Sequence, residues 1–323
     1  MSDYRIKKIG AEDFAILIPL MKDCFGMDVN IEYFHWKYID NPAGHFVGFV
    51  AIEPNTNEIG AYYGVVPQNF IINGKEITIY QSCDTMTHSK HRRLGLFKLL
   101  ALECFRVLRE EGKLFIIGFG GSQSTPGFLK FGWKQLFDFR YYFKPALFCK
   151  TAYLRSFPRE NFKEETDFNK LEPFLKKINQ TIAIHSRRNV RHMSWRTKNP
   201  NYTYKLITYS QQNMIEGYAI YYILNGKMIL FDFVFNSKKA EKGLLWYLSK
   251  ELLKNKYQGI ISFCQEKGKQ AKLLQANRFI KNPFNKGSLS EKTPFIFYAS
   301  DAEMDQFSGH DNWEITGYDH DAL

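Results

Sequence analysis

Two arginines and a glycine stand where an apolar, strand-like run gives way to an amphipathic helical pattern. The stretch reads THSKHRRLGLFKLL, residues 87–100. A strand that enters a helix through a short turn leaves the first backbone N–H groups of the helix unpaired, and the helix dipole adds positive potential. Gly95 lets a diphosphate approach the backbone, and the guanidinium groups of Arg92 and Arg93 can each bind two phosphate oxygens. The turn therefore predicts a phosphate-binding site, with an ordinary solvated loop as the alternative.

The elements that would position this turn occur twice in the chain. YFHWKYIDNPAG at 33–44 recurs loosely as HMSWRTKNPNY at 192–202, and two strand-like runs follow each copy. An Asn-Gly hairpin signal then joins the second of these runs to a third, at Asn73-Gly74 and at Asn225-Gly226. A helical pattern that closes with a glycine then leads into a short apolar strand in both copies. The order helix, helix, strand hairpin, strand, helix, strand is thus predicted twice, as an internal repeat.

The second copy lacks the charges of the first. Its helical pattern starts at Gly243, within KKAEKGLL, and the positions of the two arginines are held by Ala240 and Glu241. A carboxylate there would repel phosphate. We therefore expect phosphate binding in the first copy and a degenerate scaffold in the second.

The repeat divides the chain into three parts. We expect a first α/β domain over 1–150, a second over 160–300, and an acidic tail over 301–323. The tail contains seven acids and no Lys or Arg, and it also carries Phe307, Trp313 and Tyr318. A purely solvating tail would have few aromatic residues, so we expect it to fold back onto the basic body.

Composition limits the classes of function. The net charge of +11 favours anionic ligands, but the charges form no motif that reads RNA or DNA, so no nucleic-acid partner is expected. The five cysteines are scattered and form no C-x-x-C pair, so neither a metal site nor a disulfide framework is expected, and a reducing cytoplasm fits best. No apolar run approaches the roughly 20 residues that span a bilayer, and the N-terminus has no secretory h-region.

The residues of the first copy resemble a known superfamily. HRRLGLF at 91–97 is similar to the acyl-CoA pyrophosphate loop of the GNAT N-acetyltransferases, with Arg92 and Gly95 on the pattern and Phe97 in place of its final small residue. GFGGSQSTPGFLKFGW at 118–133 is similar to the segment after their fifth strand. The Arg-Arg-x-Gly-Leu-Phe variant resembles the Eis-like branch, which has tandem GNAT-like domains. The resemblance implies a mixed-sheet α/β fold with two such domains, the second degenerate.

The resemblance also implies where acetyl-CoA would bind. The fourth strand, EITIYQSCDTMTH, would splay from the fifth, and its backbone at Met86 and Thr87 would pair with the pantetheine arm. The pyrophosphate would rest on the residues of the turn, which are Arg92, Arg93, Leu94, Gly95, Leu96 and Phe97. Ser122 and Gln123 follow the fifth strand and could contact the thioester, or they could cap the next helix.

The catalytic groups are less clearly marked. Many GNAT enzymes use a tyrosine as the acid, but Phe128 holds the aligned position. Asp84 could be a general base, although its repeat partner Asp232 favours a structural hydrogen bond at both places. His88 could be a base near neutral pH, or an exposed turn residue. In the Eis-like branch the terminal carboxylate serves as base, and Leu323 would hold that position; a simple packed extension is the alternative.

The leading hypothesis is an N-acyltransferase that moves an acetyl group from acetyl-CoA to a small-molecule amine, an amino sugar being one such acceptor. Two alternatives stay open. One is a non-catalytic module that binds CoA or another nucleotide. The other is a Fem-like aminoacyl transferase, which has little need of a pyrophosphate loop. The sequence leaves open whether the protein is a monomer or a homodimer.

Overall fold

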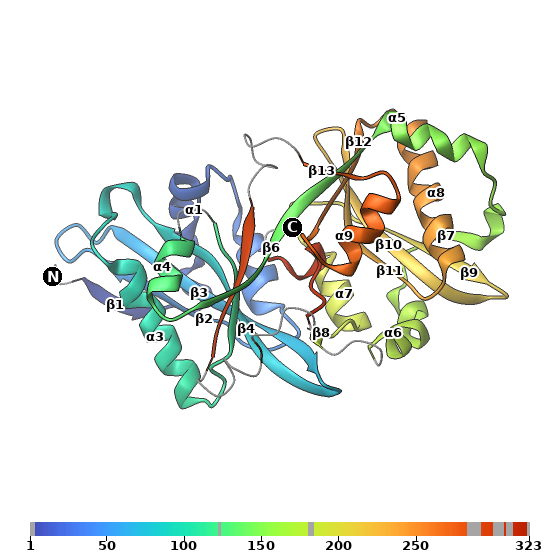
Figure 1. Cartoon of the computed structure of the whole chain (residues 1–323). Coiled ribbons are helices and arrows are strands. Elements are labelled where there is room, and N and C mark those ends of the chain that lie inside the picture. Colours follow the sequence, from blue (N-terminus) through green and yellow to red (C-terminus); the bar gives the residue numbers. More distant parts are fainter. Residues whose placement is uncertain are drawn as a thin grey trace.

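One twisted sheet runs through the whole molecule and carries helices on both of its faces (Figure 1). The computed structural model describes residues 4–121, 124–179, 184–282, 292–299, 307 and 313–321. The strand order is β1-β2-β3-β4-β5-β14-β6-β12-β11-β10-β9-β7, with β8 paired to β3 and β13 paired to β6. None of the helices among these residues is both long and apolar enough to cross a membrane.

The first half contains the strands β1 (Arg5–Lys8), β2 (Val47–Ile52), β3 (Ile59–Ile72), β4 (Lys75–Thr87), β5 (Ile116–Phe119) and β6 (Lys134–Pro145). Its helices are α1 (Leu17–Phe25), α2 (Ile31–Phe34), α3 (Leu96–Glu110) and α4 (Thr125–Lys130), with the short turns η1 (Ala11–Ile16), η2 (His35–Ile39) and η3 (Ser89–His91).

The second half contains β7 (Phe162–Glu165), β8 (Ile184–Ser186), β9 (Lys205–Gln211), β10 (Met214–Leu224), β11 (Lys227–Phe235), β12 (Gly259–Gln265), β13 (Ile280–Lys281) and β14 (Thr293–Tyr298). Its helices are α5 (Ala146–Cys149), α6 (Glu172–Ile178), α7 (Val190–Arg196), α8 (Lys238–Lys254) and α9 (Lys269–Ala276), with the turn η8 (Gly317–Asp319) near the C-terminus.

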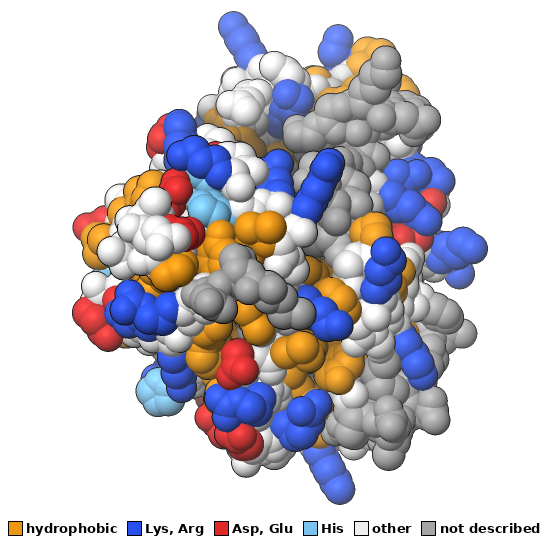
Figure 2. All heavy atoms as spheres, turned by 90° about the vertical axis from the view of Figure 1, so that its left-hand side faces the viewer, with side chains coloured by type: hydrophobic (Ala, Val, Ile, Leu, Met, Phe, Trp, Pro, Cys, Tyr) orange, Lys and Arg blue, Asp and Glu red, His pale blue; other side chains and the backbone are white. Residues whose placement is uncertain are grey.

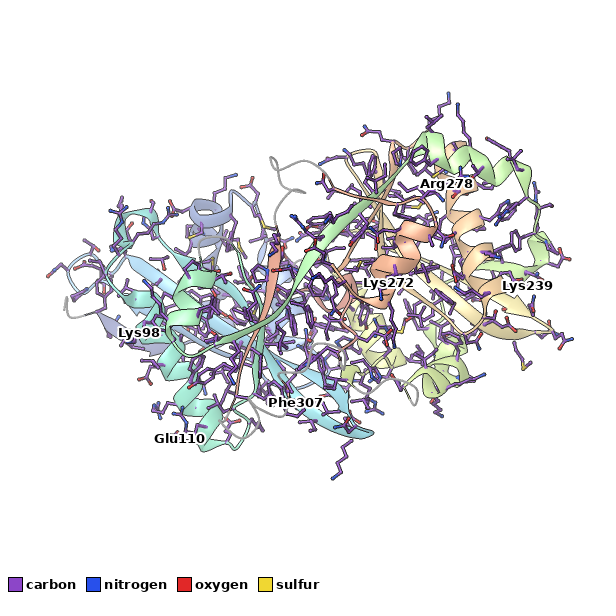
Figure 3. All side chains as sticks on the ribbon, viewed as in Figure 1. Lys98, Glu110, Lys239, Lys272, Arg278 and Phe307 are labelled. Atoms are coloured by element: carbon purple, nitrogen blue, oxygen red, sulfur yellow. The ribbon has the colours of Figure 1, made fainter. Side chains whose placement is uncertain are left out.

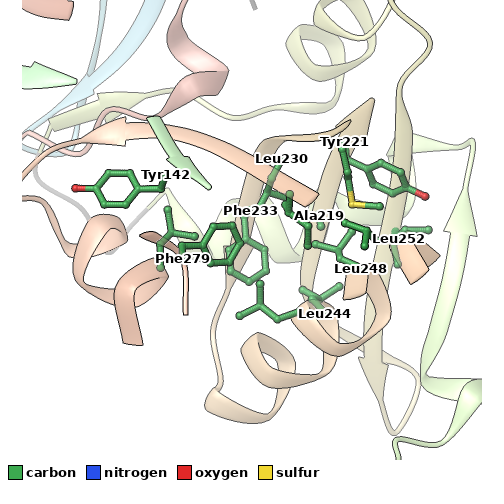
Figure 4. Close-up of a cluster of buried hydrophobic side chains, with 14 of the residues drawn as sticks. Tyr142, Ala219, Tyr221, Leu230, Phe233, Leu244, Leu248, Leu252 and Phe279 are labelled. Atoms are coloured by element: carbon green, nitrogen blue, oxygen red, sulfur yellow. The ribbon is translucent and has the colours of Figure 1, made fainter. Parts of the chain in front are cut away.

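Each half has three layers, because its central strands are buried on both faces. Along β2, Phe49 and Ala51 pack on the α3 side, while Val50 and Ile52 pack on the α1 side. In the second half, Leu244, Leu248 and Leu252 recur every four residues along α8 and form one apolar face against β10 and β11 (Figure 4). This burial, more than helix propensity, supplies most of the stability of the helices.

The two Asn-Gly hairpins are present as predicted. Asn73 and Gly74 join β3 to β4 with positive φ angles of 49° and 79°. Asn225 and Gly226 join β10 to β11 with φ angles of 48° and 71°. A two-residue hairpin turn of type I′ requires positive φ at both central positions, and its twist matches that of the flanking strands.

Two details of the second copy differ from the sequence prediction. Helix α8 begins at Lys238, not at Gly243, because Ser237 accepts a hydrogen bond from the backbone of Ala240 and starts the helix earlier. Gly259 does not cap this helix. Lys256 takes the left-handed conformation, with φ 57°, and Gly259 opens strand β12. In the first copy Gly112, with φ 67°, does close α3.

The sequence did not predict the position of β14. This strand follows the second half in the chain, yet it pairs antiparallel with β5 (Phe295 opposite Phe119) and with β6 (Phe295 opposite Phe137). The outer part of β6 in turn pairs antiparallel with β12 in the second half. In each half, therefore, a parallel strand pair is extended by a strand that belongs to the other half by sequence position.

Two tryptophans from equivalent places in the repeat join the halves. The rings of Trp36 and Trp195 stack with their centroids 5.4 Å apart. The indole Nε1 of Trp36 donates to the carbonyl oxygen of Trp195 at 2.7 Å, and Nε1 of Trp195 donates to that of Trp36 at 2.6 Å. Such reciprocity is what a local two-fold relation between the copies produces.

The described stretch 313–321 of the tail is packed between the halves. Trp313 and Tyr318 are buried. The Tyr318 hydroxyl lies 2.6 Å from Nδ1 of His192. The ring of His320 packs on Phe119 with centroids 4.4 Å apart. The tail is thus an internal element of the molecule.

The buried histidines of this contact predict a loss of stability in acid. Burial lowers the pKa of His192 to about 3 and that of His320 to about 4. In the unfolded chain an imidazole titrates near pH 6.5, so between these values the unfolded state binds more protons. The free energy of unfolding should therefore fall as the pH drops from about 7 to about 4.5, by on the order of 2–3 kcal/mol for His320.

Urea unfolding at the two pH values measures this loss. His320→Gln should lose less stability between them than the parent protein, while His45→Gln, at an exposed position, should lose the same amount as the parent. Equal losses in His320→Gln and the parent would contradict the assignment.

Candidate active site

The first feature of the site is a gap between β4 and β5. The two strands pair in parallel from Tyr80 opposite Ile116 to Ser82 opposite Gly118. Beyond Ser82, β4 continues to Thr87 paired with β3 alone among the described residues, while β5 pairs with β14 along its other edge and ends at Phe119. Among the described residues, the edge of β4 that faces β5 therefore has no strand partner from Cys83 onward, and this is the edge where the resemblance places the arm of an acyl-CoA.

The basic turn lies at the open end of this gap. After η3 the chain takes φ 67° at Arg93 and φ 77° at Gly95, and α3 begins at Leu96. No side chain caps the N-terminus of α3 in the described chain, and a Cβ placed on Gly95 would meet no atom within 4 Å. The first N–H groups of a 15-residue helix thus point into open space beside Arg92 and Arg93, which are both exposed.

The surroundings of this turn suit an anion with an organic part. On the face that carries α3 and α4, lysine and arginine side chains stand around a hydrophobic area (Figure 2). The exposed apolar residues on these elements and the turn are Leu94, Leu99, Leu102 and Leu129. Lys98, in the first turn of α3, adds a further positive charge (Figure 3).

The equivalent helix of the second half has no such opening. Ser237 caps α8, and the buried carboxylate of Glu241 stands in its first turn. The carboxylate of Glu241 accepts hydrogen bonds from Nζ of Lys238 at 2.7 Å and from the side-chain amide of Asn277 at 3.0 Å. The N-terminus of α8 is therefore satisfied from within the protein, where that of α3 is not.

The strand gap of the second half is also closed. Strands β11 and β12 pair in parallel only as far as Leu230 opposite Ser262. Beyond that point Thr316 of the tail bridges to Cys264, and η8 packs against both strands. The chain's own tail thus occupies the place that stays open in the first half.

Asp84 lies in a strand bulge and is held by two partners. Its φ is 47°, at the irregularity where β4 departs from regular pairing with β3. Nζ of Lys37 lies 2.8 Å from its Oδ2, and the Tyr38 hydroxyl donates to the same oxygen at 2.6 Å. The side chains of Lys37 and Asp84 are only 2% and 8% exposed. Both partners favour a structural role for this carboxylate.

The same lysine also binds the tail. Nζ of Lys37 lies 2.9 Å from Oδ2 of Asp321, whose Oδ1 accepts a hydrogen bond from Gln81 at 3.2 Å. Burial alone would raise the pKa of Asp321 and lower that of Lys37. The attraction between the charges prevails, so the pKa of Asp321 is lowered and that of Lys37 is raised well above its usual value. Gln81 is paired with Ile117 beside the last β4–β5 pair, so the tail reaches the point where the gap begins.

The second half repeats the arrangement around its own aspartate. Arg188 forms a two-pronged ion pair with Asp232, with both N–O distances at 3.1 Å, and the Tyr218 hydroxyl donates to Asp232 at 2.6 Å. An aspartate held by a buried cation and a tyrosine therefore occurs in both copies. The cation differs in position, since Arg196 aligns with Lys37 in the repeat.

The other predicted residues lie as follows. Met86 is buried, and the carbonyl oxygen of Thr87 accepts from Sγ of Cys24 and from Nε of Arg92, each at 3.4 Å. The side chain of His88 turns toward Glu58 and away from Asp84, with Nε2 3.6 Å from Oε1 of Glu58. Ser122, Gln123 and Leu323 lie outside the described residues. Phe128 is buried against Phe97 and Trp133.

Sequence reasoning missed Lys37 and Asp321. Lys37 was seen only as one letter of the repeat, and Asp321 only as one of several tail acids. A usable signal was present for Lys37, because it follows Tyr33 by four residues in a segment whose other residues are mostly aromatic. A lysine on such a face is buried and needs a partner, but the partner is 284 positions away.

Removing the lysine should therefore destabilise the protein. Lys37→Met leaves two buried carboxylates without their cation, and we expect a loss of about 3–5 kcal/mol in the free energy of unfolding. Adding Asp84→Asn removes one of those charges and should restore part of the loss. Lys98→Met, which removes an exposed lysine, should change stability by no more than about 0.5 kcal/mol. Denaturant unfolding of these four proteins and of Asp84→Asn alone completes the cycle, and a loss below about 1 kcal/mol in Lys37→Met would contradict the prediction.

Comparison with known proteins agrees with this geometry. Residues 5–136 match the family model of an acetyltransferase (GNAT) domain. No curated protein matches the sequence. Among solved structures, the chain is similar to a conserved protein of unknown function from Enterococcus faecalis V583, described as a probable N-acyltransferase, with a TM-score of 0.70 at 14% identity over 92% of this chain and 72% of that chain.

Two further structures share the fold. A GCN5-related N-acetyltransferase from Anabaena variabilis gives a TM-score of 0.66 at 13% identity, over 92% of this chain and 74% of that chain. N-myristoyltransferase of Saccharomyces cerevisiae with bound myristoyl-CoA gives 0.63 at 11% identity, over 93% and 79%. Residues 5–136 thus match a GNAT acetyltransferase domain, and the chain as a whole shares its fold with these solved structures.

Proposed function

We propose that the protein transfers an acetyl group from acetyl-CoA to a primary amine of a small molecule, as in the Eis-like branch of the superfamily. One observation carries this proposal. Of the two equivalent helix N-termini, that of α3 is uncapped, flanked by Arg92 and Arg93, and placed at the mouth of an open strand gap. A diphosphate is the group that such a site fits.

The donor would lie along β4. The backbone N–H groups from Leu94 to Phe97 would hold the diphosphate, and the open edge of β4 at Met86 and Thr87 would pair with the pantetheine arm. The thioester would then point toward the start of the gap, near Gln81 and Asp321. Ser122 and Gln123 are proposed to contact the thioester from the β5 side.

The acceptor would enter beside the charges of the tail. Lys37 is shared by Asp84 and Asp321, so these three groups carry one negative charge in excess, which the buried Arg196 nearby offsets in part. A cationic amine is attracted to such a place. An amino sugar is one acceptor of this class.

Transfer requires the amine in its neutral form. Its nitrogen attacks the thioester carbonyl carbon and gives up a proton to a base. The carbon–sulfur bond then breaks, and the sulfur takes up a proton and leaves as the thiol of CoA. The resemblance implies the main-chain carboxylate of Leu323 as the base. Two residues follow Asp321, and two residues span at most about 7 Å. The carboxylate of Leu323 can therefore lie near the start of the gap only if the chain continues from Asp321 toward the gap. His88 and Asp84 are the other candidates, although Asp84 is already bound to Lys37 and Tyr38.

The two alternative functions make different demands on the turn. A Fem-like aminoacyl transferase takes its acyl group from tRNA, and the uncapped α3 would then have no ligand. A CoA-binding module without turnover would keep both the turn and the gap. Only an assay of acyl transfer can distinguish such a module from an enzyme.

Donor binding can be tested at the turn. Arg92→Glu replaces a phosphate partner by a repelling charge and should weaken acetyl-CoA binding in calorimetry by at least about tenfold. Lys239→Glu makes a similar charge change at the start of α8 (Figure 3) and should leave the affinity unchanged. Equal affinity in Arg92→Glu and the parent would refute the site, and binding without thiol release across a panel of amines would favour the binding module.

The base can be tested at the chain end. Deleting Leu323 moves the terminal carboxylate back by one residue, whereas Leu323→Ala keeps it in place. If this carboxylate is the base, the deletion should lower kcat by roughly 10²–10⁴-fold, with little change in acetyl-CoA affinity. Leu323→Ala should keep most of the activity. Full activity in the deletion, or a comparable loss in His88→Ala alone, would move the role to another group.

A further inference from the structure

A group of metal-type ligands lies at the entry to the basic turn. Glu58 precedes β3, His88 follows β4, and His91 ends η3. Nε2 of His91 lies 3.2 Å from Oε2 of Glu58, and Nε2 of His88 lies 3.6 Å from Oε1. One ligand atom from each residue can be chosen so that all three lie within 4.8 Å of one another. The side chains of His88 and His91 are 18% and 10% exposed, and that of Glu58 is 35% exposed.

The two nitrogen–oxygen distances, which run to the two oxygens of Glu58, are close to the edge length of a metal tetrahedron, whereas the 4.8 Å bound on the whole set exceeds it, so the ligands would have to close on the ion. Zinc binds imidazole nitrogen and carboxylate oxygen at about 2.0–2.2 Å, so two ligand atoms in tetrahedral geometry stand about 3.3–3.5 Å apart. The three residues come from two segments that the β3–β4 sheet already holds together, so little rearrangement is needed to bring the ligands to one point. Two imidazoles and a carboxylate form the donor set of many zinc sites that keep a fourth position for water.

A hydrogen bond at the far nitrogen orients the ring of His91. Nδ1 of His91 lies 2.5 Å from the hydroxyl of Tyr4, which leaves its Nε2 directed at Glu58. A metal-bound imidazole commonly donates its second N–H to such an outer partner. Nδ1 of His88 accepts from the backbone of Lys90 at 3.3 Å. Metal at Nε2 would place the proton on Nδ1, so this long hydrogen bond would have to open.

The ammonium group of Lys90 lies beside Glu58, where the metal ion would bind. Nζ of Lys90 lies 3.4 Å from Oε1 of Glu58, but its side chain is 73% exposed and can turn into solvent. An exposed ion pair of this kind contributes little to stability, so a divalent cation that also binds two imidazoles would displace it.

We propose that Glu58, His88 and His91 bind a divalent transition-metal ion of the zinc class. The ion would join the β2–β3 hairpin to the start of the turn that leads to α3. The cysteine pattern gave no reason to expect a metal, because these ligands are histidine and glutamate. The site shares His88 with the candidates for the base, but its existence does not depend on the acyltransferase proposal, because metal binding is measured without acetyl-CoA or an acceptor.

Metal binding can be measured directly. The full chain, freed of any affinity tag and stripped with a chelator, is titrated with Zn²⁺ by calorimetry and with Co²⁺ by visible absorption. We expect one ion per chain and the strong visible bands of four-coordinate Co²⁺. His88→Ala and Glu58→Gln should each weaken Zn²⁺ binding by at least about tenfold, and Tyr4→Phe by up to about tenfold, since it removes only an outer partner.

His45→Ala, which removes an exposed histidine elsewhere, is the matched control and should bind like the parent protein. His91 is the most buried ligand, so the partly exposed His88 and Glu58 carry the test if His91→Ala does not fold. The proposal is overturned if the parent protein binds no Zn²⁺ at micromolar concentration, or if binding survives unchanged in the double variant Glu58→Gln, His88→Ala.

Discussion

The N–H groups at the start of a helix need acceptors, and the two long helices of this protein meet that need differently. In α8 a serine and a buried glutamate fill the first turn. In α3 the chain turns through two residues of positive φ and offers no side-chain acceptor in the described structure. The same fold therefore contains one helix end that is complete by itself and one that requires water or a ligand. That difference, more than the charge of the body, is why an anionic donor is assigned to the first half alone.

The tail also differs in how it meets the two strand gaps. Between β11 and β12 it supplies Thr316 and the turn η8, so the second gap is filled. It then continues to the start of the first gap, where Lys37 binds Asp321. A buried lysine needs a compensating charge, and here it has one from β4 and one from the tail. The position of the tail end is thus fixed by the interaction that also stabilises the bulge of β4.

Local signals in the sequence predicted local features well. The Asn-Gly hairpins, the repeat and the basic turn before α3 all depend on neighbouring residues, and each could be read directly. The position of β14 could not be read, because β5 and β14 are short apolar runs and nothing in their patterns states which strand pairs with which. The contact of Lys37 with Asp321 joins residues 284 positions apart, so its evidence exists only in the folded chain. The early start of α8 was missed because Ser237 was not considered as a cap.

The second half remains necessary even if it binds no donor. Strand β14 lies between β5 and β6 in the sheet, and it follows β13 in the chain. The tail that reaches Lys37 follows β14 in turn. Both elements can arrive at the first half only after the chain has completed the second, and the stacked pair of Trp36 and Trp195 fixes the halves against each other. The degenerate copy therefore acts as the structural path by which the chain delivers a strand and a carboxylate group to the site of the other copy.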